Sequence, residues 1–397
     1  MAMLQLGMRV AEAELPLRPT EKTVSFFLPN LRLGGAEKVT VHLANGLAAR
    51  GYPVDMVLFQ AKGEFLKELD PAIRLVDLKT HRMLWAISRF AGYLRDRRPA
   101  IVISALDYVN VGAILARRLS RTSTPVVVTI HATQSMAAMY RHGFRSRVVG
   151  RLGRWFYRRS QNIICVSQGV ADDLAVTTGT ERHRMQVVYN PVVSQRTLDL
   201  ANEPLDHPWF APGAPPVVLA VGRLTVVKDY PTLIRAFATI RAGAPAESLA
   251  GAGRDVRLMI LGEGEERPRL ERLISELGLK DRVALPGFGA NPYTYMAKAA
   301  VFVLSSISEA LPTALIEAMA VGTPVVATDC KSGPREVLHG GLYGALVPVG
   351  DVAALAAAIS ATLRAPRPEL PPEAIRPYTM DYAIDEYCRI IEEVTHE

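Results

Sequence analysis

The sequence contains few cysteines and no long apolar run. Cys165, Cys330 and Cys388 are the only three in 397 residues, and their spacing offers neither a disulfide framework nor a metal-binding pattern. We therefore expect buried thiols and a reducing, cytoplasmic compartment. No stretch approaches the ~20 consecutive apolar residues of a membrane-spanning helix, and residues 1–8 are too short and too uncharged for a signal peptide.

Several familiar binding motifs are also missing. The sequence has no G-x-x-x-x-G-K-[ST] loop, which argues against a P-loop phosphate site. Residues 262–267 (GEGEER) carry only two glycines of a dinucleotide fingerprint, and their glutamates would repel a pyrophosphate. No zinc-ligand spacing or RNA-binding aromatic signature occurs, so we expect no nucleic-acid partner.

Short apolar runs alternate with helical patterns along most of the chain. Those of the first half are 24–28, 54–59, 101–104, 126–130 and 162–166. The pattern restarts with 217–221, 257–261, 283–285, 301–304 and 324–328. Near-continuous apolar strands separated by helices are typical of parallel sheets covered on both faces.

The length suits two domains of ~150–200 residues. We predict an α/β protein with two tandem Rossmann-like, doubly wound domains facing across a cleft, the natural ligand site of such a pair. The predicted segments are an extension at 1–23, a first domain at 24–190, a proline-rich hinge at 191–216, a second domain at 217–376 and a C-terminal helix at 377–397. The apolar face of that helix would suit packing back onto the first domain.

The net charge of +7 is unevenly distributed. Residues 1–190 contain 27 Lys and Arg against 14 Asp and Glu, whereas the remainder contains 19 against 25. The basic first half favours an anionic partner, either a membrane surface or an anionic acceptor.

Two glutamates bracket a predicted helix start. Glu309 lies just before it, Pro312 suits the first helical position, and Glu317 lies in the second turn. A helix N-terminus favours phosphate, whereas carboxylates accept hydrogen bonds from diols. A phosphate flanked by two polyols describes a nucleotide sugar, although a solvated loop Glu and an ordinary helix Glu would give the same spacing.

Other polar residues follow predicted strands. Gly222, Arg223 and Lys228 come after the strand 217–221, where the cations could contact a diphosphate; a solvated basic loop is the alternative. His131 follows the strand 126–130, a position from which it could donate to a sugar or phosphate oxygen.

Two further segments each allow two interpretations. Gly34 and Gly35 permit either a close approach to a ligand or only a tight turn. Residues 141–159 combine arginines with an apolar stripe, which suits an anionic membrane surface or a domain helix whose apolar face is core.

Taken together, these motifs resemble those of the retaining glycosyltransferases of family 4, which have the GT-B fold. The resemblance runs over about residues 24–395, in the expected order. It rests on Gly34–Glu37, His131, Val166–Ser167, Asn190–Val192, Gly222–Leu224 with Lys228, Ser308–Ala320 and Gly322–Ala327.

The resemblance implies roles for the donor-binding residues. Arg223 and Lys228, beside Gly222, would neutralise the donor diphosphate and stabilise it as leaving group. Backbone amides near Leu311, Pro312 and Thr313 would assist.

It also implies how the two sugars are held. Glu317 would bind the ribose hydroxyls and Glu309 those of the transferred sugar, with His131 positioning that sugar. Gly34 and Gly35 would let the first-domain loop reach the reaction centre.

The implied activity is metal-independent and cofactor-free transfer of a hexose, with retention of anomeric configuration, from a nucleotide-diphosphate sugar to a saccharide or lipid-linked acceptor. UDP is the preferred nucleotide by resemblance only. Residues 331–336 resemble members that build surface polysaccharides, which suggests a cytoplasmic protein peripheral to the inner face of the cell membrane.

One residue departs from the family pattern, and two alternatives stay open. Ala310 stands where the family often has Gly, at a turn that would suit a positive φ. A sugar-nucleotide epimerase or phosphorylase, or a non-catalytic nucleotide-sugar-binding protein, could share the same two-domain plan.

Overall fold

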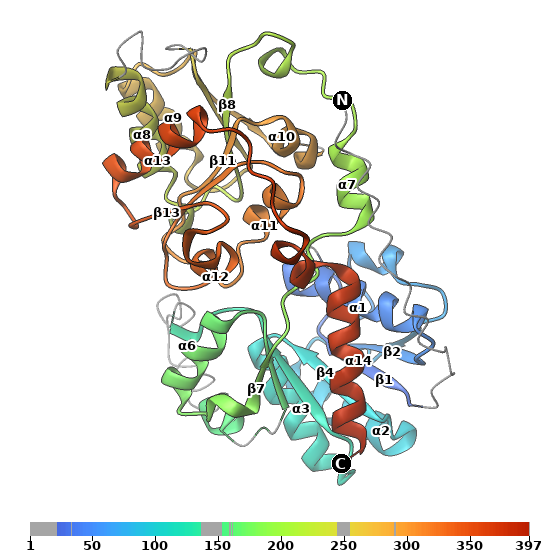
Figure 1. The fold of residues 1–397 in the computed structure, drawn as a ribbon. Coiled ribbons are helices and arrows are strands. Elements are labelled where there is room, and N and C mark those ends of the chain that lie inside the picture. The colour runs from blue at the N-terminus through green and yellow to red at the C-terminus, as the bar shows by residue number, and fades with distance from the viewer. Residues whose placement is uncertain are drawn as a thin grey trace.

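Two α/β domains make up the protein, one above the other in Figure 1. The computed structural model describes residues 22–32, 34–135, 153–158, 160, 162–243, 255–289 and 291–396. The predicted extension 1–23 and the basic segment 141–159 therefore lie largely outside the described residues. No helix in the described ranges is long and apolar enough to cross a membrane.

The first domain is built on a seven-stranded sheet in which every pair is parallel, in the order β3-β2-β1-β4-β5-β6-β7. Its strands are β1 (Val24–Leu28), β2 (Val54–Leu58), β3 (Arg74–Asp77), β4 (Ile101–Ala105), β5 (Val126–Ile130), β6 (Asn162–Cys165) and β7 (Met185–Val187). Its helices include α1 (Gly35–Ala49), α2 (Met83–Arg97), α3 (Asp107–Ser120) and α6 (Gln168–Thr178).

The second domain is built on a six-stranded parallel sheet in the order β10-β9-β8-β11-β12-β13. Its strands are β8 (Val217–Val221), β9 (Arg257–Leu261), β10 (Val283–Gly287), β11 (Val301–Leu304), β12 (Val325–Thr328) and β13 (Ala345–Val347). Its helices include α8 (Tyr230–Gly243), α9 (Arg267–Glu276), α10 (Pro292–Lys298), α11 (Thr313–Ala320), α12 (Pro334–Val337) and α13 (Val352–Arg364).

This architecture confirms the predicted fold class. Strands such as β1, β4 and β8 are almost fully buried, as expected of a parallel sheet covered on both faces. Both sheets reverse their strand order beside their first strand, at β2-β1-β4 and at β9-β8-β11. Ligands of open α/β sheets bind outside the carboxyl ends of the strands at such switch points.

The C-terminal helix α14 (Met380–His396) runs along the first domain beside α1 (Figure 1). Its Ile384 contacts Gly46 of α1, and Asp385 pairs with Arg50 at 2.6 Å. The chain crosses between the domains twice, before α7 (Gln195–Ala201) and before α14, and the two crossings are joined. The Met380 amide donates to the Val193 carbonyl (3.1 Å), and the Val193 amide to the Tyr378 carbonyl (3.0 Å).

The described part of the basic segment, residues 153–158, has two environments. Phe156 and Tyr157 are buried, whereas Trp155 is 42% exposed beneath the guanidinium of Arg118. The short stretch therefore contributes to the core through one face and reaches solvent through the other.

Candidate active site

The two domains meet at the carboxyl ends of their strands. Ser167, which follows β6, donates its hydroxyl hydrogen to the carbonyl of Ala310, which lies between β11 and α11 (2.7 Å). Ser332, after β12, donates to the same carbonyl (3.3 Å). This junction brings together the loops that carry the predicted site residues.

The loop after β8 is fixed by its backbone and leaves its arginine in solvent. The Gly222 amide donates to Leu261 (2.9 Å) and the Leu224 amide to Glu263 (2.8 Å), which joins this loop to the end of β9. The Arg223 side chain is 76% exposed, and its nearest carboxylate is Glu265 at 3.8 Å. Its guanidinium is therefore available to an anionic ligand.

Lys228 and Glu309 form the central ion pair of the site. The Lys228 ammonium lies 2.6 Å from Glu309 Oε1, and the two side chains are 23% and 11% exposed. Ser306 Oγ donates to the same oxygen (2.6 Å), and Ser305 Oγ donates to the Lys228 carbonyl (2.7 Å). The loops after β8 and β11 thus hold one carboxylate and one ammonium in a fixed, largely buried position.

Glu317 lies in α11, as predicted, and is held by a tyrosine. Tyr293 of α10 donates its hydroxyl hydrogen to Glu317 Oε1 (3.3 Å). Burial raises the pKa of Glu317 to about 7, although the charge of Lys38 and the bond from Tyr293 oppose the rise. Lys38 belongs to α1, so this carboxylate faces a cation of the first domain.

The turn before α11 differs in detail from the prediction. Pro312 precedes the first helical residue instead of occupying it. Proline has no N–H, and the Thr313 amide donates to the Leu311 carbonyl (3.0 Å). Of these three residues, only the Leu311 amide remains for a ligand.

Ala310 does not need the backbone conformation that the sequence suggested. It is absent from the described non-glycine residues with positive φ, so its Cβ causes no strain. The left-handed position in this region belongs to Gly333 (φ 89°), which packs on the Pro312 ring. The departure from the family pattern at Ala310 is therefore accommodated.

The two glycines before α1 are not equivalent. A Cβ on Gly34 would overlap the carboxylate of Glu37, whereas a Cβ on Gly35 would meet nothing within 4 Å. Gly34 is extended, with φ −163°, a conformation open to any residue. Only Gly35 faces open space in which a ligand could approach the backbone.

His131 is a neutral acceptor rather than a donor toward the site. The Thr129 hydroxyl donates its hydrogen to the Ser104 carbonyl (2.9 Å), so it must accept from His131 Nε2 (3.0 Å). Nδ1 is then a lone pair, and it is buried with no partner among the described residues. Burial lowers the pKa of His131 to about 4, so an uncharged ring can accept a hydroxyl hydrogen there.

The position of His131 follows from strand register. Ile130 of β5 pairs with Cys165 of β6, so the next residues along the two chains, His131 and Val166, lie side by side, one residue before Ser167. Ser167 donates to Ala310, so this edge of the first sheet meets the loop that carries Glu309. The structure thus pairs Lys228 with Glu309 and places His131 at the carboxyl edge of the first sheet, beside the segment that contacts the loop of Glu309.

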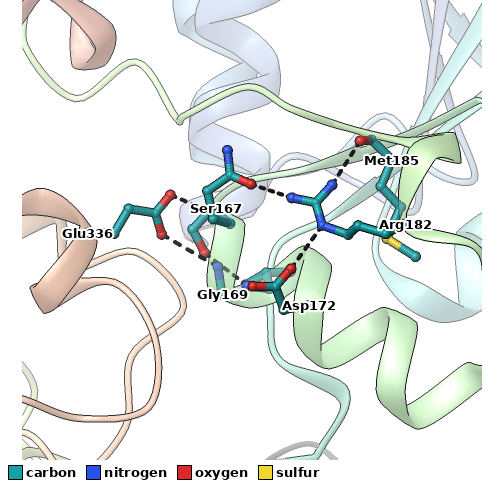
Figure 2. Close-up of polar contacts among 8 residues, drawn as sticks. Ser167, Gly169, Asp172, Arg182, Met185 and Glu336 are labelled. Carbon is teal, nitrogen blue, oxygen red and sulfur yellow. Dashed lines mark hydrogen bonds and ion pairs between the residues drawn. The ribbon is translucent and has the colours of Figure 1, made fainter.

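Glu336 of α12, in the second domain, binds the start of α6, the helix of the first domain that follows Ser167 (Figure 2). Its carboxylate accepts hydrogen bonds from the Gln168 amide (2.8 Å), the Gly169 amide (3.5 Å) and the Tyr189 hydroxyl (2.6 Å). A negative charge at the N-terminus of α6 is also favoured by the helix dipole. On the other side of this contact, Figure 2 shows Arg182 bound to Asp172 of α6.

Sequence reasoning did not assign roles to four of these residues: Ser306, Tyr293, Lys38 and Glu336. Ser306 could have been found from its position directly after a buried strand. The other three belong to helices whose faces toward the site depend on tertiary packing. No group of three or more His, Cys, Asp or Glu side chains suited to a metal occurs in the described ranges.

Comparison with known families gives two adjacent matches. Residues 33–196 match the model described as Glycosyltransferase Family 4. Residues 203–376 match the model described as Glycosyl transferases group 1. The two matches divide at the linker between the two sheets.

Similar proteins include two bacterial glycosyltransferases that match most of the chain. The lipopolysaccharide core biosynthesis glycosyltransferase LpsE of Rhizobium meliloti is 28% identical over 333 residues, 82% of this chain and 84% of LpsE. An N-acetylgalactosamine-N,N'-diacetylbacillosaminyl-diphospho-undecaprenol 4-alpha-N-acetylgalactosaminyltransferase of Campylobacter jejuni is 29% identical over 342 residues, 83% of this chain and 86% of that protein.

Solved structures share the fold. The lipopolysaccharide outer core galactosyltransferase WaaB superposes with a TM-score of 0.73 at 20% identity, covering 94% of this chain and 99% of WaaB. Anabaena HepE in complex with UDP gives 0.70 at 20% identity, with 94% and 100% covered. Both likenesses establish the two-domain arrangement.

Proposed function

The chain belongs to the family 4 glycosyltransferases, and from that membership and the geometry of the domain junction we propose that it moves a hexose from a nucleotide-diphosphate sugar to a saccharide or lipid-linked acceptor. The observation that carries the proposal is the Glu309 carboxylate, 11% exposed and bound to both Lys228 and Ser306. A carboxylate held so firmly beside a helix start suits recognition of sugar hydroxyls next to a diphosphate.

The donor would lie along the carboxyl ends of the second sheet. Glu317 accepts hydrogen bonds from the ribose diol at one end, and Glu309 accepts from the transferred sugar at the other. Arg223, which is exposed, and Lys228, which retains N–H groups beyond the one on Glu309, contact the diphosphate between them.

The first domain would complete the site around the sugar. His131 Nδ1 has no described partner and accepts a hydrogen bond from a sugar hydroxyl. Gly35, with open space on its Cα, allows the start of α1 to approach the reaction centre. The second domain would therefore hold the nucleotide, and the first domain would contact the transferred sugar.

In the reaction, the bond from the anomeric carbon to the diphosphate breaks and a bond to the acceptor oxygen forms on the same face. The acceptor proton passes to the departing phosphate oxygen. Arg223 and Lys228 stabilise the negative charge that develops on the leaving diphosphate, the role a metal ion plays elsewhere. Retention of configuration and metal independence are part of this proposal.

The acceptor and location are proposed from the relatives. One relative acts in lipopolysaccharide core synthesis, and another is named for a diphospho-undecaprenol acceptor. A saccharide on a lipid carrier would place this enzyme in the cytoplasm at the inner face of the cell membrane. UDP is the preferred nucleotide, since HepE is described in complex with it.

A donor panel tests the proposal. UDP-, GDP- and ADP-sugars are screened by thermal shift, then by release of nucleoside diphosphate, and the anomeric configuration of any glycoside product is read by NMR. We expect one nucleotide class to stabilise the protein and to be consumed without added metal. Failure of every donor to bind would contradict the proposal.

The same panel separates the alternatives. An epimerase would return an isomerised nucleotide sugar without releasing nucleoside diphosphate, and a phosphorylase would require phosphate and a pyridoxal-binding lysine. A non-catalytic binder would be stabilised by the donor but would never consume it.

A further inference from the structure

A large basic cavity lies at the end of the first domain that is remote from the site described above. Its volume is about 1070 Å³, and residues that precede β4, β5 and β6 line it, among them Pro99, Pro125 and Ser160. In Figure 1 this end of the domain, with α2, α3 and the C-terminus, points away from the second domain.

The cavity and the proposed active site occupy opposite ends of the same strand. Val126, the first residue of β5, lines the cavity, whereas His131 follows the last residue of that strand. Five residue steps at a rise of ~3.3 Å separate the two positions by about 17 Å. The cavity is therefore distinct from the junction that holds Glu309.

The lining is strongly cationic. It contains the six basic side chains Lys22, Arg95, Arg98, Arg117, Arg118 and Arg121 and no Asp or Glu. Within the described ranges, none of these six forms an ion pair with a carboxylate. Six like charges that form no ion pair within the described part of the chain repel one another, and a polyanion would relieve that repulsion.

The helix dipole explains part of this arrangement. Arginines in the last turns of α2 and α3 complement the negative ends of those helices. It does not explain Arg98 and Arg121, which cap the two helices in the left-handed conformation, with φ 47° and 57°. Glycine is the usual residue there, so two arginines persist at a conformational cost and line the same cavity.

Some groups of the cavity are already positioned for a ligand. The Arg118 guanidinium stacks over the rings of Trp155 (5.0 Å) and Phe156 (5.5 Å), which fixes its plane. The Lys22 ammonium is held by the Thr395 hydroxyl (2.9 Å). Guanidinium forks interleaved with hydroxyl groups are suited to phosphate oxygens.

We propose that this cavity is a second, non-catalytic site that binds phosphate-bearing anions. The volume and the six cations exceed what one phosphate ion would need, so the ligand carries several phosphates or presents an array of them. Two sources have this chemistry, a soluble polyphosphate and the headgroups of an anionic membrane. Two apolar side chains beside the cavity are exposed. Leu119, 53% exposed, lies in α3 with Arg117 and Arg118, and Trp155, 42% exposed, stacks on Arg118.

The test compares two variants with the same change in charge. Arg117→Glu with Arg121→Glu reverses two cations of the cavity. Arg235→Glu with Arg272→Glu reverses two exposed arginines of α8 and α9 in the second domain and serves as the control. Both variants keep Arg223 and Lys228, so phosphate binding at the donor site is equal in the two.

Two probes distinguish the sources. Inorganic tripolyphosphate is titrated by calorimetry, and vesicles with phosphatidylglycerol are compared with vesicles of phosphatidylcholine alone by flotation. We expect the cavity variant to lose about tenfold or more in affinity relative to the control. Loss toward tripolyphosphate alone identifies a soluble ligand, and loss toward anionic vesicles identifies headgroups; either supports the site.

Equal binding of both probes by the cavity variant and the control would overturn the proposal. Thermal unfolding of each variant checks that the fold survives. If the charge reversal disrupts folding, Arg117→Gln with Arg121→Gln removes the two charges without adding repulsion. That variant should show a smaller loss in the same direction, and unchanged affinity would again contradict the site.

Discussion

At the scale of single residues, the two carboxylates that bracket the start of α11 differ in their surroundings. Glu309 is bound to an ammonium and a hydroxyl. Among the described residues, Glu317 has the Tyr293 hydroxyl alone at hydrogen-bond distance, and a more distant cation in Lys38. The two glutamates thus differ: Glu309 is tightly paired, whereas burial disfavours the charged form of Glu317.

Because burial disfavours the charged carboxylate of Glu317, we predict that removing that charge increases stability in a pH-dependent way. Burial raises the pKa of Glu317 to about 7 from 4.5, so the native protein binds a proton more tightly than the unfolded chain. Its contribution to stability is full below pH 4.5 and is lost as the pH rises through 7. Glu317→Gln should therefore raise the free energy of unfolding by about 1–2 kcal/mol at pH 8 and little at pH 5.

Urea denaturation of wild type and Glu317→Gln at the two pH values measures this difference. The same variant should bind nucleoside diphosphate more weakly, because an amide replaces an acceptor for the ribose diol. A gain of equal size at both pH values would show that the carboxyl does not titrate in this range.

Replacing His131 should lower the activity without changing its pH profile. Burial lowers the pKa of His131 to about 4, so its ring stays neutral across the working range. His131→Phe keeps a ring but removes the Nδ1 acceptor, and donor hydrolysis should fall about 10- to 100-fold. A monodeoxy donor that lacks the bound hydroxyl should lose no further activity in this variant.

Kinetics with a set of monodeoxy donors provide the check. If every deoxy donor loses as much in His131→Phe as in wild type, no sugar hydroxyl reaches this nitrogen.

At the scale of elements, the loop after β8 depends on the close approach of two backbones. Gly262 has φ 147°, and a Cβ on it would overlap the Gly222 carbonyl. Gly262→Ala should destabilise the protein by about 2–4 kcal/mol and weaken donor binding, because Arg223 and Lys228 move with this loop.

Gly278→Ala is the matched control. Gly278 also has a positive φ, 64°, but nothing lies within 4 Å of its Cβ position. It should lose only the conformational term, about 1 kcal/mol, and keep the donor affinity of wild type. Equal melting temperatures of the two variants would rule out the backbone contact as the cause.

Most strands could be predicted from the sequence, whereas the short edge strands β3, β7 and β13 and the polar contacts could not. Near-continuous apolar runs predicted strands such as β1, β5 and β8, because a strand buried on both faces has no polar alternation. The pairing of Lys228 with Glu309 joins residues 81 positions apart, and it exists only because β8 and β11 are neighbours. Strand order is a tertiary property that no local pattern encodes.

At the scale of the whole molecule, the carboxylate of Glu336 holds the two domains in their observed arrangement. It accepts from α6 and from Tyr189, while Ser167 donates in the opposite direction to Ala310. The double crossing near Val193 and Tyr378 lies behind this contact and can act as the hinge. A buried apolar cluster also spans the two domains, with Val166 and Val170 of the first and Leu311 and Leu315 of the second.

Glu336→Gln should therefore favour an open arrangement. The amide loses the charge that α6 favours at its N-terminus, a loss of about 1 kcal/mol or more. We expect a larger radius of gyration by small-angle scattering and a donor KM raised about 3- to 10-fold. Glu369→Gln, at an exposed position, is the control. Identical scattering profiles of the two variants would show that the Glu336 contact does not hold the domains together.

Glu309 is the residue proposed to bind the sugar that is transferred. The most direct measurement is the release of nucleoside diphosphate from the preferred donor by wild type, Glu309→Gln and the control Glu265→Gln, which changes an exposed carboxylate beside Arg223. We predict a fall of about 100-fold or more for Glu309→Gln alone, with its melting temperature and nucleotide binding preserved. Release by Glu309→Gln at the wild-type rate would contradict the assignment of the site.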